Sequence, residues 1–251
     1  MVFGLWLIII FTLIYEPFIG YFGYQKFKFA VRENLNARLN YYIKLIIGLW
    51  IPTISIILLV FFTDLDFKDI GLAYPNIDTK TLGNVITYSI FVIAILYLLS
   101  ILYYFIAYHL SDKFRTKFIQ AKEEQLNTVS FSDIIPVTSK EKKLWNYVSL
   151  TAGVTEEIIY RGFLIFALSY IFPSFSIWLI IFFSSLLFGL AHTYQGLLGV
   201  LKTTMVGILF SGIYIGLGSI LPLIVFHFLI DYVAKLGDSK SEDKHLIHNQ
   251  T

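Results

Sequence analysis

Seven long apolar stretches dominate the sequence, and each is long enough to cross a lipid bilayer. A transmembrane helix needs about 20 predominantly apolar residues. The pattern therefore predicts an all-α, polytopic integral membrane protein with about seven transmembrane helices. The first stretch lacks the charged start and small-residue cleavage site of a signal peptide, so we expect it to be retained. The predicted spans are Val2–Phe22, Tyr41–Phe62, Gly83–Leu110, Trp145–Tyr170, Phe175–Tyr194, Leu197–Gly216 and Ile220–Leu236.

Composition supports this class. The chain is 57% hydrophobic and 14% charged, with a mean hydropathy of +0.73, whereas soluble domains are roughly 45 to 50% apolar and about 25% charged. The sequence contains no cysteine. Disulfides, thiolate catalysis and cysteine-ligated metals are therefore excluded.

Lysine and arginine collect in two of the predicted loops, and such loops are typically cytoplasmic. We therefore expect a multi-pass plasma-membrane protein with its N-terminus outside and its C-terminus in the cytoplasm. A protein of the endoplasmic reticulum would show the same pattern. The positive residues of the first loop are Lys26, Lys28, Arg32, Arg38 and Lys44, and those of the third are Lys113, Arg115, Lys117, Lys122, Lys140, Lys142 and Lys143.

The third loop divides the chain into parts of different character. Residues 1–139 are predicted to form a three-helix membrane scaffold with a cytoplasmic loop, in which Glu16 and His109 serve as interface or capping groups near helix ends. Residues 140–236 carry the polar groups with chemical potential. The polar tail at 237–251 is predicted to be a disordered cytoplasmic segment.

Three charged residues interrupt the apolar helix predicted at Trp145–Tyr170, namely Glu156, Glu157 and Arg161. One charge near the centre of a spanning helix costs roughly 2.5 to 3.5 kcal/mol on insertion scales, and such residues usually mark a functional site. Glu157 and Arg161 are four residues apart and share a helix face, so we expect them to pair. Glu156 then remains free to accept a proton. The alternative is that all three only join helices through buried hydrogen bonds.

Further polar residues occur in two later helices. His192 ends one predicted span, and His227 and Asp231 share a face of the last helix because they are four residues apart. Each histidine alone could be a hydrogen-bonded packing residue. Two imidazoles and at least two carboxylates together favour catalysis or metal binding.

The second half of the sequence resembles the CPBP intramembrane proteases, also called the CAAX protease and bacteriocin-processing (Abi) family. The resemblance spans about residues 140 to 236 and consists of three motifs in separate helices in the expected order. These are an EExxxR motif, an FxxxH motif, and a final histidine followed four residues later by Asn or Asp. The matching positions are Glu156, Glu157 and Arg161, then Phe188 and His192, then His227 and Asp231.

The resemblance implies an all-helical fold with a cavity open toward the cytoplasm and lipid, in which a peptide bond is hydrolysed. It also implies that Glu156 is a general base that activates water with the help of His192. His227 and Asp231 take the positions assigned to stabilising the oxyanion. These roles are physically reasonable, because a desolvated carboxylate is a better base and a positioned imidazole can donate a hydrogen bond to developing negative charge.

The resemblance further implies that Glu157 and Arg161 hold the site in shape. Asp231 departs from the family pattern, because the best-understood relatives have Asn there and an ionised Asp cannot donate a hydrogen bond to an oxyanion. Either Asp231 is protonated or its role differs. It could orient His227 or share a proton with Glu156.

A metal-dependent peptidase is an alternative mechanism, with Glu156, His192, His227 and Asp231 as zinc ligands that generate a hydroxide near neutral pH. The family has been described both as metalloproteases and as glutamate proteases. We favour a glutamate-type endopeptidase without a cofactor, because the sequence has no HExxH run.

The expected partners are membrane lipid and a membrane-associated or lipidated protein or peptide substrate, and no nucleic acid. CAAX-type processing, bacteriocin-type leader removal and regulatory cleavage all remain open. A non-catalytic alternative is a bacteriocin immunity or membrane scaffold protein that uses the same polar site. An ion or proton pathway is a third possibility, but we find no inverted repeat in the sequence.

Overall fold

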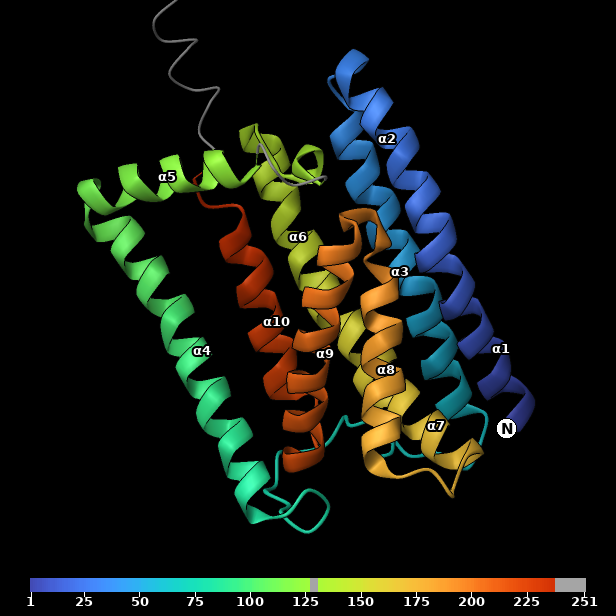
Figure 1. Ribbon diagram of the computed structural model, residues 1–251. Helices are drawn as coiled ribbons and strands as arrows, with labels where there is room; N and C mark the ends of the chain where they lie inside the picture. Colours follow the sequence, from blue (N-terminus) through green and yellow to red (C-terminus); the bar gives the residue numbers. More distant parts are fainter. Residues whose placement is uncertain (127–130, 238–251) are drawn as a thin grey trace, which may run out of the picture.

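The computed structural model describes residues 1–126 and 131–237, which form helices joined by loops, with no β-strand in these ranges (Figure 1). The first half contains α1 (Val2–Ile14), η1 (Tyr15–Gly20), α2 (Tyr21–Glu33), α3 (Ala37–Phe61), α4 (Asn84–Leu110), α5 (Asp112–Leu126) and η2 (Ser132–Ile134). The second half contains α6 (Ser139–Glu156), η3 (Glu157–Leu164), α7 (Ile165–Ile171), α8 (Ile177–Ala191), η4 (Thr193–Gln195), α9 (Leu197–Leu217) and α10 (Leu221–Ala234). The predicted all-α class is confirmed for this part of the chain, and the predicted tail at 237–251 lies outside it except for Gly237.

The membrane character of the chain is also confirmed. Besides four long apolar runs, the structure has two apolar helices shorter than 18 residues, α8 and α10. The continuous run from α6 to α7 carries the charged triplet. Length and composition thus identify four spans in the described ranges and do not establish the predicted count of seven. The four runs that are long and apolar enough to cross a membrane are Val2–Glu33, Ala37–Phe61, Asn84–Leu110 and Leu197–Leu217.

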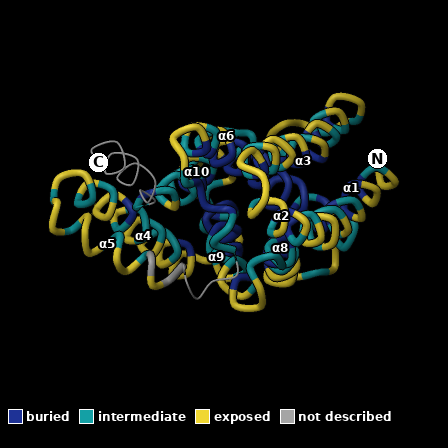
Figure 2. The backbone as a smooth tube through the Cα atoms, turned by 90° about the horizontal axis from the view of Figure 1, so that it is seen from above, coloured by how far each residue is buried: buried dark blue, intermediate teal, exposed yellow. Residues whose placement is uncertain are grey.

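The run formed by α6, η3 and α7 is the centre of the bundle. Every residue of η3 is buried, and α6 packs against α3 on one side and α10 on another. Figure 2 shows buried backbone concentrated around α6, α9 and α10, whereas α4 and α5 are mostly half-buried or exposed. The charged triplet therefore lies in the best-packed part of the molecule.

Glycine allows α6 and α10 to approach closely. A Cβ atom on Gly153 would lie 3.0 Å from the carbonyl oxygen of Ile224 and 3.1 Å from the amide nitrogen of Phe228. Both neighbours are backbone atoms of α10, which cannot rotate away. This contact brings the helix that carries the carboxylates against the helix that carries His227 and Asp231.

The 62–83 loop closes the opposite end of the bundle from the positively charged loops. Ile70 in this loop is fully buried, and Gly71 adopts a φ of +74°, which favours glycine. The Gly71 carbonyl accepts a 2.9 Å hydrogen bond from the Ile220 amide at the start of α10. Gly162 in η3 faces the Ile70 carbonyl so closely that a side chain there would collide with it. The loop therefore packs directly against the segment that contains Arg161.

Helix α6 begins at a capping box. The Glu141 carboxylate accepts 2.8 Å hydrogen bonds from the amides of Val137 and Thr138, and the Thr138 hydroxyl accepts one from the Glu141 amide. Arg38 of α3 donates to the same carboxylate at 3.0 Å. Burial alone raises the pKa of Glu141, but the hydrogen bonds from Thr138 and Val137 and the Arg38 guanidinium more than offset this effect. The net result is a pKa below its ordinary value.

We predict that the Glu141 carboxylate gives the protein a pH-dependent stability. Because its pKa is lowered by folding, the stabilisation is present above the ordinary value of 4.5 and is lost as the pH falls through the lower folded value. The melting temperature of a Glu141→Gln variant should therefore lie furthest below that of the wild type at neutral pH, and the gap should shrink toward pH 3. An equal gap at all pH values would contradict this assignment.

We also predict that Gly153→Leu destabilises the fold by roughly 1 to 3 kcal/mol or more, because overpacking against backbone atoms cannot be relieved by side-chain rotation. Gly23→Leu is the matched control, since no heavy atom lies within 4 Å of the ideal Cβ position at Gly23. The melting temperature in detergent should fall for the first variant and stay constant or rise for the second. Equal behaviour of the two variants would argue against close α6–α10 packing.

Candidate functional site

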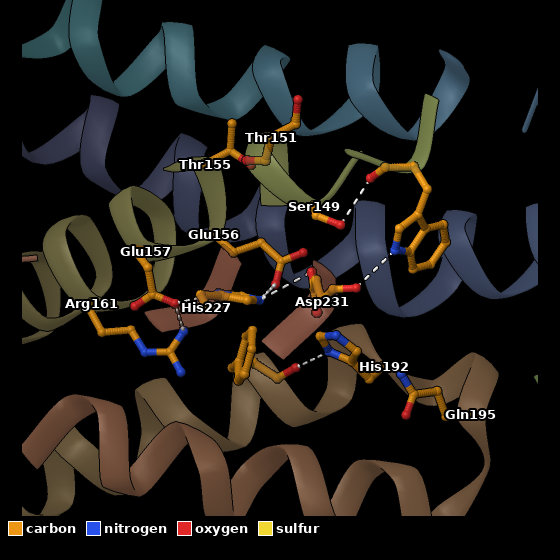
Figure 3. Close-up of polar contacts among 12 residues, drawn as sticks. Ser149, Thr151, Thr155, Glu156, Glu157, Arg161, His192, Gln195, His227 and Asp231 are labelled. Atoms are coloured by element: carbon orange, nitrogen blue, oxygen red, sulfur yellow. Dashed lines mark hydrogen bonds and ion pairs between the residues drawn. The ribbon is translucent and has the colours of Figure 1, made fainter. Parts of the chain in front are cut away.

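The charged triplet lies where the central helix changes its geometry. Glu156 is the last residue of α6, and Glu157 is the first of the π-helical segment η3. π-helical turns are rare and often occur at functional sites. The widened turn is supported from α8, because the Ser184 hydroxyl donates a 2.6 Å hydrogen bond to the Tyr160 carbonyl. Figure 3 shows that Glu156 and Glu157 leave the helix in different directions.

Glu157 is the hub of the polar cluster. One of its oxygens, Oε1, accepts a 3.1 Å hydrogen bond from Arg161 Nη1 and lies 2.7 Å from His227 Nδ1 (Figure 3). Glu157 is fully buried and Arg161 is only 1% exposed. Since a carboxylate accepts hydrogen bonds, Nδ1 of His227 is the donor in this contact. The predicted pairing of Glu157 with Arg161 is thus present, and it includes a histidine that sequence spacing did not connect to it.

His227 turns its other nitrogen toward two more carboxylates. Nε2 lies 3.8 Å from Glu156 Oε2 and 3.7 Å from Asp231 Oδ2. Glu156 Oε2 is buried and forms no hydrogen bond with any described residue. Asp231 is held through its backbone, because its carbonyl accepts a 2.9 Å hydrogen bond from the Trp145 indole. The structure therefore brings Glu156, His227 and Asp231 together as the sequence predicts.

His192 reaches the same cavity from the end of α8 without contacting the carboxylates. Its Nδ1 lies 2.9 Å from the Phe188 carbonyl, one turn earlier. If Nδ1 carries the proton of a neutral ring, Nε2 is left as an acceptor. Only its place on the cavity wall connects His192 with Glu156.

The Arg161 guanidinium lies over the faces of two aromatic rings. Its central carbon lies 4.1 Å from the ring centre of Phe188 and 5.2 Å from that of Phe210. A cation above a desolvated aromatic ring gains roughly 2 kcal/mol. Phe188 therefore has a definite electrostatic role. Sequence reasoning missed Phe210, because one phenylalanine in an apolar helix looks like any other.

A cavity of about 590 Å³ extends from these groups toward the end of the bundle at which α2 connects to α3. Its wall includes Glu156, His192, His227 and Asp231 at the inner end, and Lys26 and Lys44 at positions nearer the α2–α3 connection. Glu16 also lines it. The expected position of Glu16 near a helix end was wrong, because Glu16 lies in η1, within the helical run Val2–Glu33.

The four candidate zinc ligands line one cavity. Zinc requires ligand atoms at about 2.0 to 2.2 Å, so at least three must converge on one point. Within the described ranges, no group of three or more His, Asp or Glu side chains is placed to hold a metal ion.

Residues 141–233 match the family model described as type II CAAX prenyl endopeptidase Rce1-like. This segment is a CAAX protease domain. The match includes every residue of the polar cluster described above and begins within the α6 capping box. No curated protein and no solved structure matches the chain. The similarity of this segment to CAAX proteases supports a membrane-bound peptidase acting on a membrane-associated protein or peptide, whereas α1 to α5 lie outside the match.

We predict strong energetic coupling between Glu157 and Arg161 in the CAAX protease domain. Removal of one partner of a buried ion pair leaves an unpaired buried charge and costs roughly 3 to 5 kcal/mol. Glu157→Leu and Arg161→Met should each destabilise the protein strongly, and the double variant should lose less than the sum of the two losses.

Chemical unfolding in detergent measures this cycle. The exposed pair of Asp112 and Arg115, which are 2.5 Å apart in α5, is the control, and should show little coupling because solvent screens it. Additive losses at Glu157 and Arg161 would show that the two side chains do not act as a pair.

Proposed function

We propose that the protein is an intramembrane endopeptidase of the glutamate type, in which Glu156 activates water and His227 stabilises the oxyanion. The observation that carries this proposal is the arrangement of Glu156: a buried carboxylate oxygen with no hydrogen bond to a described residue, on the wall of a cavity and 3.8 Å from an imidazole nitrogen. Glu157 Oε2 is also buried without a hydrogen-bond partner among the described residues, but of the two glutamates only Glu156 lies on the described wall of the cavity. A general base needs a free oxygen.

The chemistry follows from the positions of the side chains. Glu156 removes a proton from water, and the resulting hydroxide attacks the peptide carbonyl carbon. The carbonyl oxygen becomes an oxyanion, which accepts a hydrogen bond from protonated Nε2 of His227. Glu156 then returns the proton to the leaving nitrogen as the C–N bond breaks. His192 lines the same cavity and orients the water with its acceptor nitrogen.

The Glu157–Arg161 pair supports this reaction by fixing the ring of His227. Because Glu157 accepts the hydrogen bond from Nδ1, the ring cannot flip, and Nε2 stays directed toward Glu156. Asp231 lies 3.7 Å from the same nitrogen. We therefore assign Asp231 to orienting His227 and favouring its protonated form, rather than to donating to the oxyanion.

The orientation in the membrane is inferred from the location of the positive residues. The α2–α3 connection, α5 and the beginning of α6 lie at one end of the bundle in Figure 1. These segments contain the positive clusters expected in the cytoplasm. We propose seven spans in a plasma membrane, with the N-terminus outside, and a cavity that admits substrate from the cytoplasmic side. The substrate class that fits this cavity is a membrane-associated or lipidated protein or peptide.

Cleavage of a quenched membrane-peptide library by the purified protein tests the mechanism. Loss of general-base catalysis costs about 100-fold or more, so we expect Glu156→Gln to reduce kcat by at least that factor. Glu124→Gln in α5, an exposed position, is the matched control and should leave kcat unchanged. His192→Gln should reduce kcat, while His109→Gln should not, although both histidines lie close to the carbonyl four residues earlier.

A strong chelator separates the mechanisms. Retained activity of the chelated wild type supports the glutamate mechanism, whereas loss that zinc restores would transfer Glu156, His192, His227 and Asp231 to metal-site roles. A non-catalytic immunity or scaffold protein predicts a different result, in which a folded wild type cleaves no peptide and Glu156→Gln keeps its binding partner.

A further inference from the structure

Glu16 is a further intramembrane carboxylate, and the mechanism above does not use it. It lies near the middle of the helical run Val2–Glu33, where an ionisable side chain is costly and usually functional. The π-helical segment η1 contains it, followed by Pro17, which has no amide hydrogen. The first helix thus carries its wide turn at the residue that faces the cavity.

The two oxygens of Glu16 have different surroundings. Oε2 accepts a 3.1 Å hydrogen bond from the Tyr160 hydroxyl, and Tyr160 belongs to the same segment η3 as Glu157 and Arg161. Oε1 is buried and has no hydrogen-bond partner among the described residues. One oxygen therefore fixes the side chain and the other is available to a ligand.

A second contact fixes this part of the first helix relative to the site. The Thr193 hydroxyl donates a 3.0 Å hydrogen bond to the Pro17 carbonyl. Thr193 directly follows His192, so η1 is tied both to the end of α8 and to η3. These two hydrogen bonds hold Glu16 in a fixed place on the cavity wall, because both come from segments that also form the site.

We propose that Glu16 is a binding subsite for the substrate, in which Oε1 accepts a hydrogen bond from a backbone N–H group of the peptide. This inference rests on the proposed function, because it assumes a peptide in the cavity. Most of the cavity wall is apolar, as a membrane peptide requires, but the N–H groups of an unwound peptide each need an acceptor there. A carboxylate offers acceptors only and makes the stronger, charge-assisted bond.

A purely structural role for Glu16 predicts different behaviour. Glutamine retains an amide oxygen for the Tyr160 hydroxyl, so it would preserve the join between the helices. Tyr160→Phe removes that join but keeps the carboxylate. The two variants therefore separate the oxygen that binds Tyr160 from the oxygen that faces the cavity.

Peptide binding and cleavage are measured together. The dissociation constant is determined in the Glu156→Gln background, with the library peptide that binds this variant most tightly, so that hydrolysis does not interfere. We expect Glu16→Gln to raise both the KM and this dissociation constant by about five- to tenfold, because a charge-assisted hydrogen bond is lost. The kcat should change less than about twofold, and the melting temperature should not change. Tyr160→Phe should lower the melting temperature with a smaller effect on KM.

Substitution of single peptide bonds in the ligand by esters identifies the N–H group. The ester that removes this N–H should weaken binding to the protein in which Glu16 is intact. It should not weaken binding further in the Glu16→Gln variant. Unchanged KM and dissociation constant in Glu16→Gln, or ester effects that are the same in both proteins, would overturn the subsite. If the wild type cleaves no peptide but binding still depends on Glu16, the peptidase proposal fails and the subsite stands. If cleavage occurs without any dependence on Glu16, the reverse holds.

Discussion

The whole second half of this protein depends on the burial of one arginine. The Arg161 guanidinium is 1% exposed in an apolar bundle, so its charge must be balanced where it lies. Glu157 balances it from the same helix, and the rings of Phe188 and Phe210 flank it from α8 and α9. Glu157 in turn fixes His227 of α10. Four helical segments are thus positioned by one charge and its neutralisation.

The π-helical segments explain how an apolar bundle accommodates a polar cavity. Both η1 and η3 widen a long helix at the depth where carboxylates must project from it, and hydroxyl groups of other segments satisfy nearby carbonyls. The Tyr160–Glu16 bond joins the two wide turns. The first helix is therefore part of the site, although it lies outside the region that matches the CAAX protease family.

Spacing in the sequence predicted those parts of the site that depend on one helix. Glu157 and Arg161, and likewise His227 and Asp231, are four residues apart, and helical geometry alone places them together. Contacts between helices were not predictable in this way. The bond from His227 to Glu157 and that from Tyr160 to Glu16 join residues 70 and 144 positions apart. The π-helical turns have no recognisable sequence signal either. Glu16 was misplaced near a helix end because the charged residues of α2 were predicted as a loop, whereas α2 continues the first helical run to Glu33.

The closure of the outer end of the bundle has a consequence for the membrane itself. The 62–83 loop is bound to α9 and α10 through the amides of Asn76, Asp78 and Ile220, and it buries Ile70 behind η3. The cavity wall, as far as the described residues define it, includes no residue of this loop. Among the described residues, the cavity wall therefore does not extend to this end of the bundle. A peptidase site of the kind proposed above, reached from the other end only, would admit water to its carboxylates while the bilayer keeps its ion gradients and electrical potential.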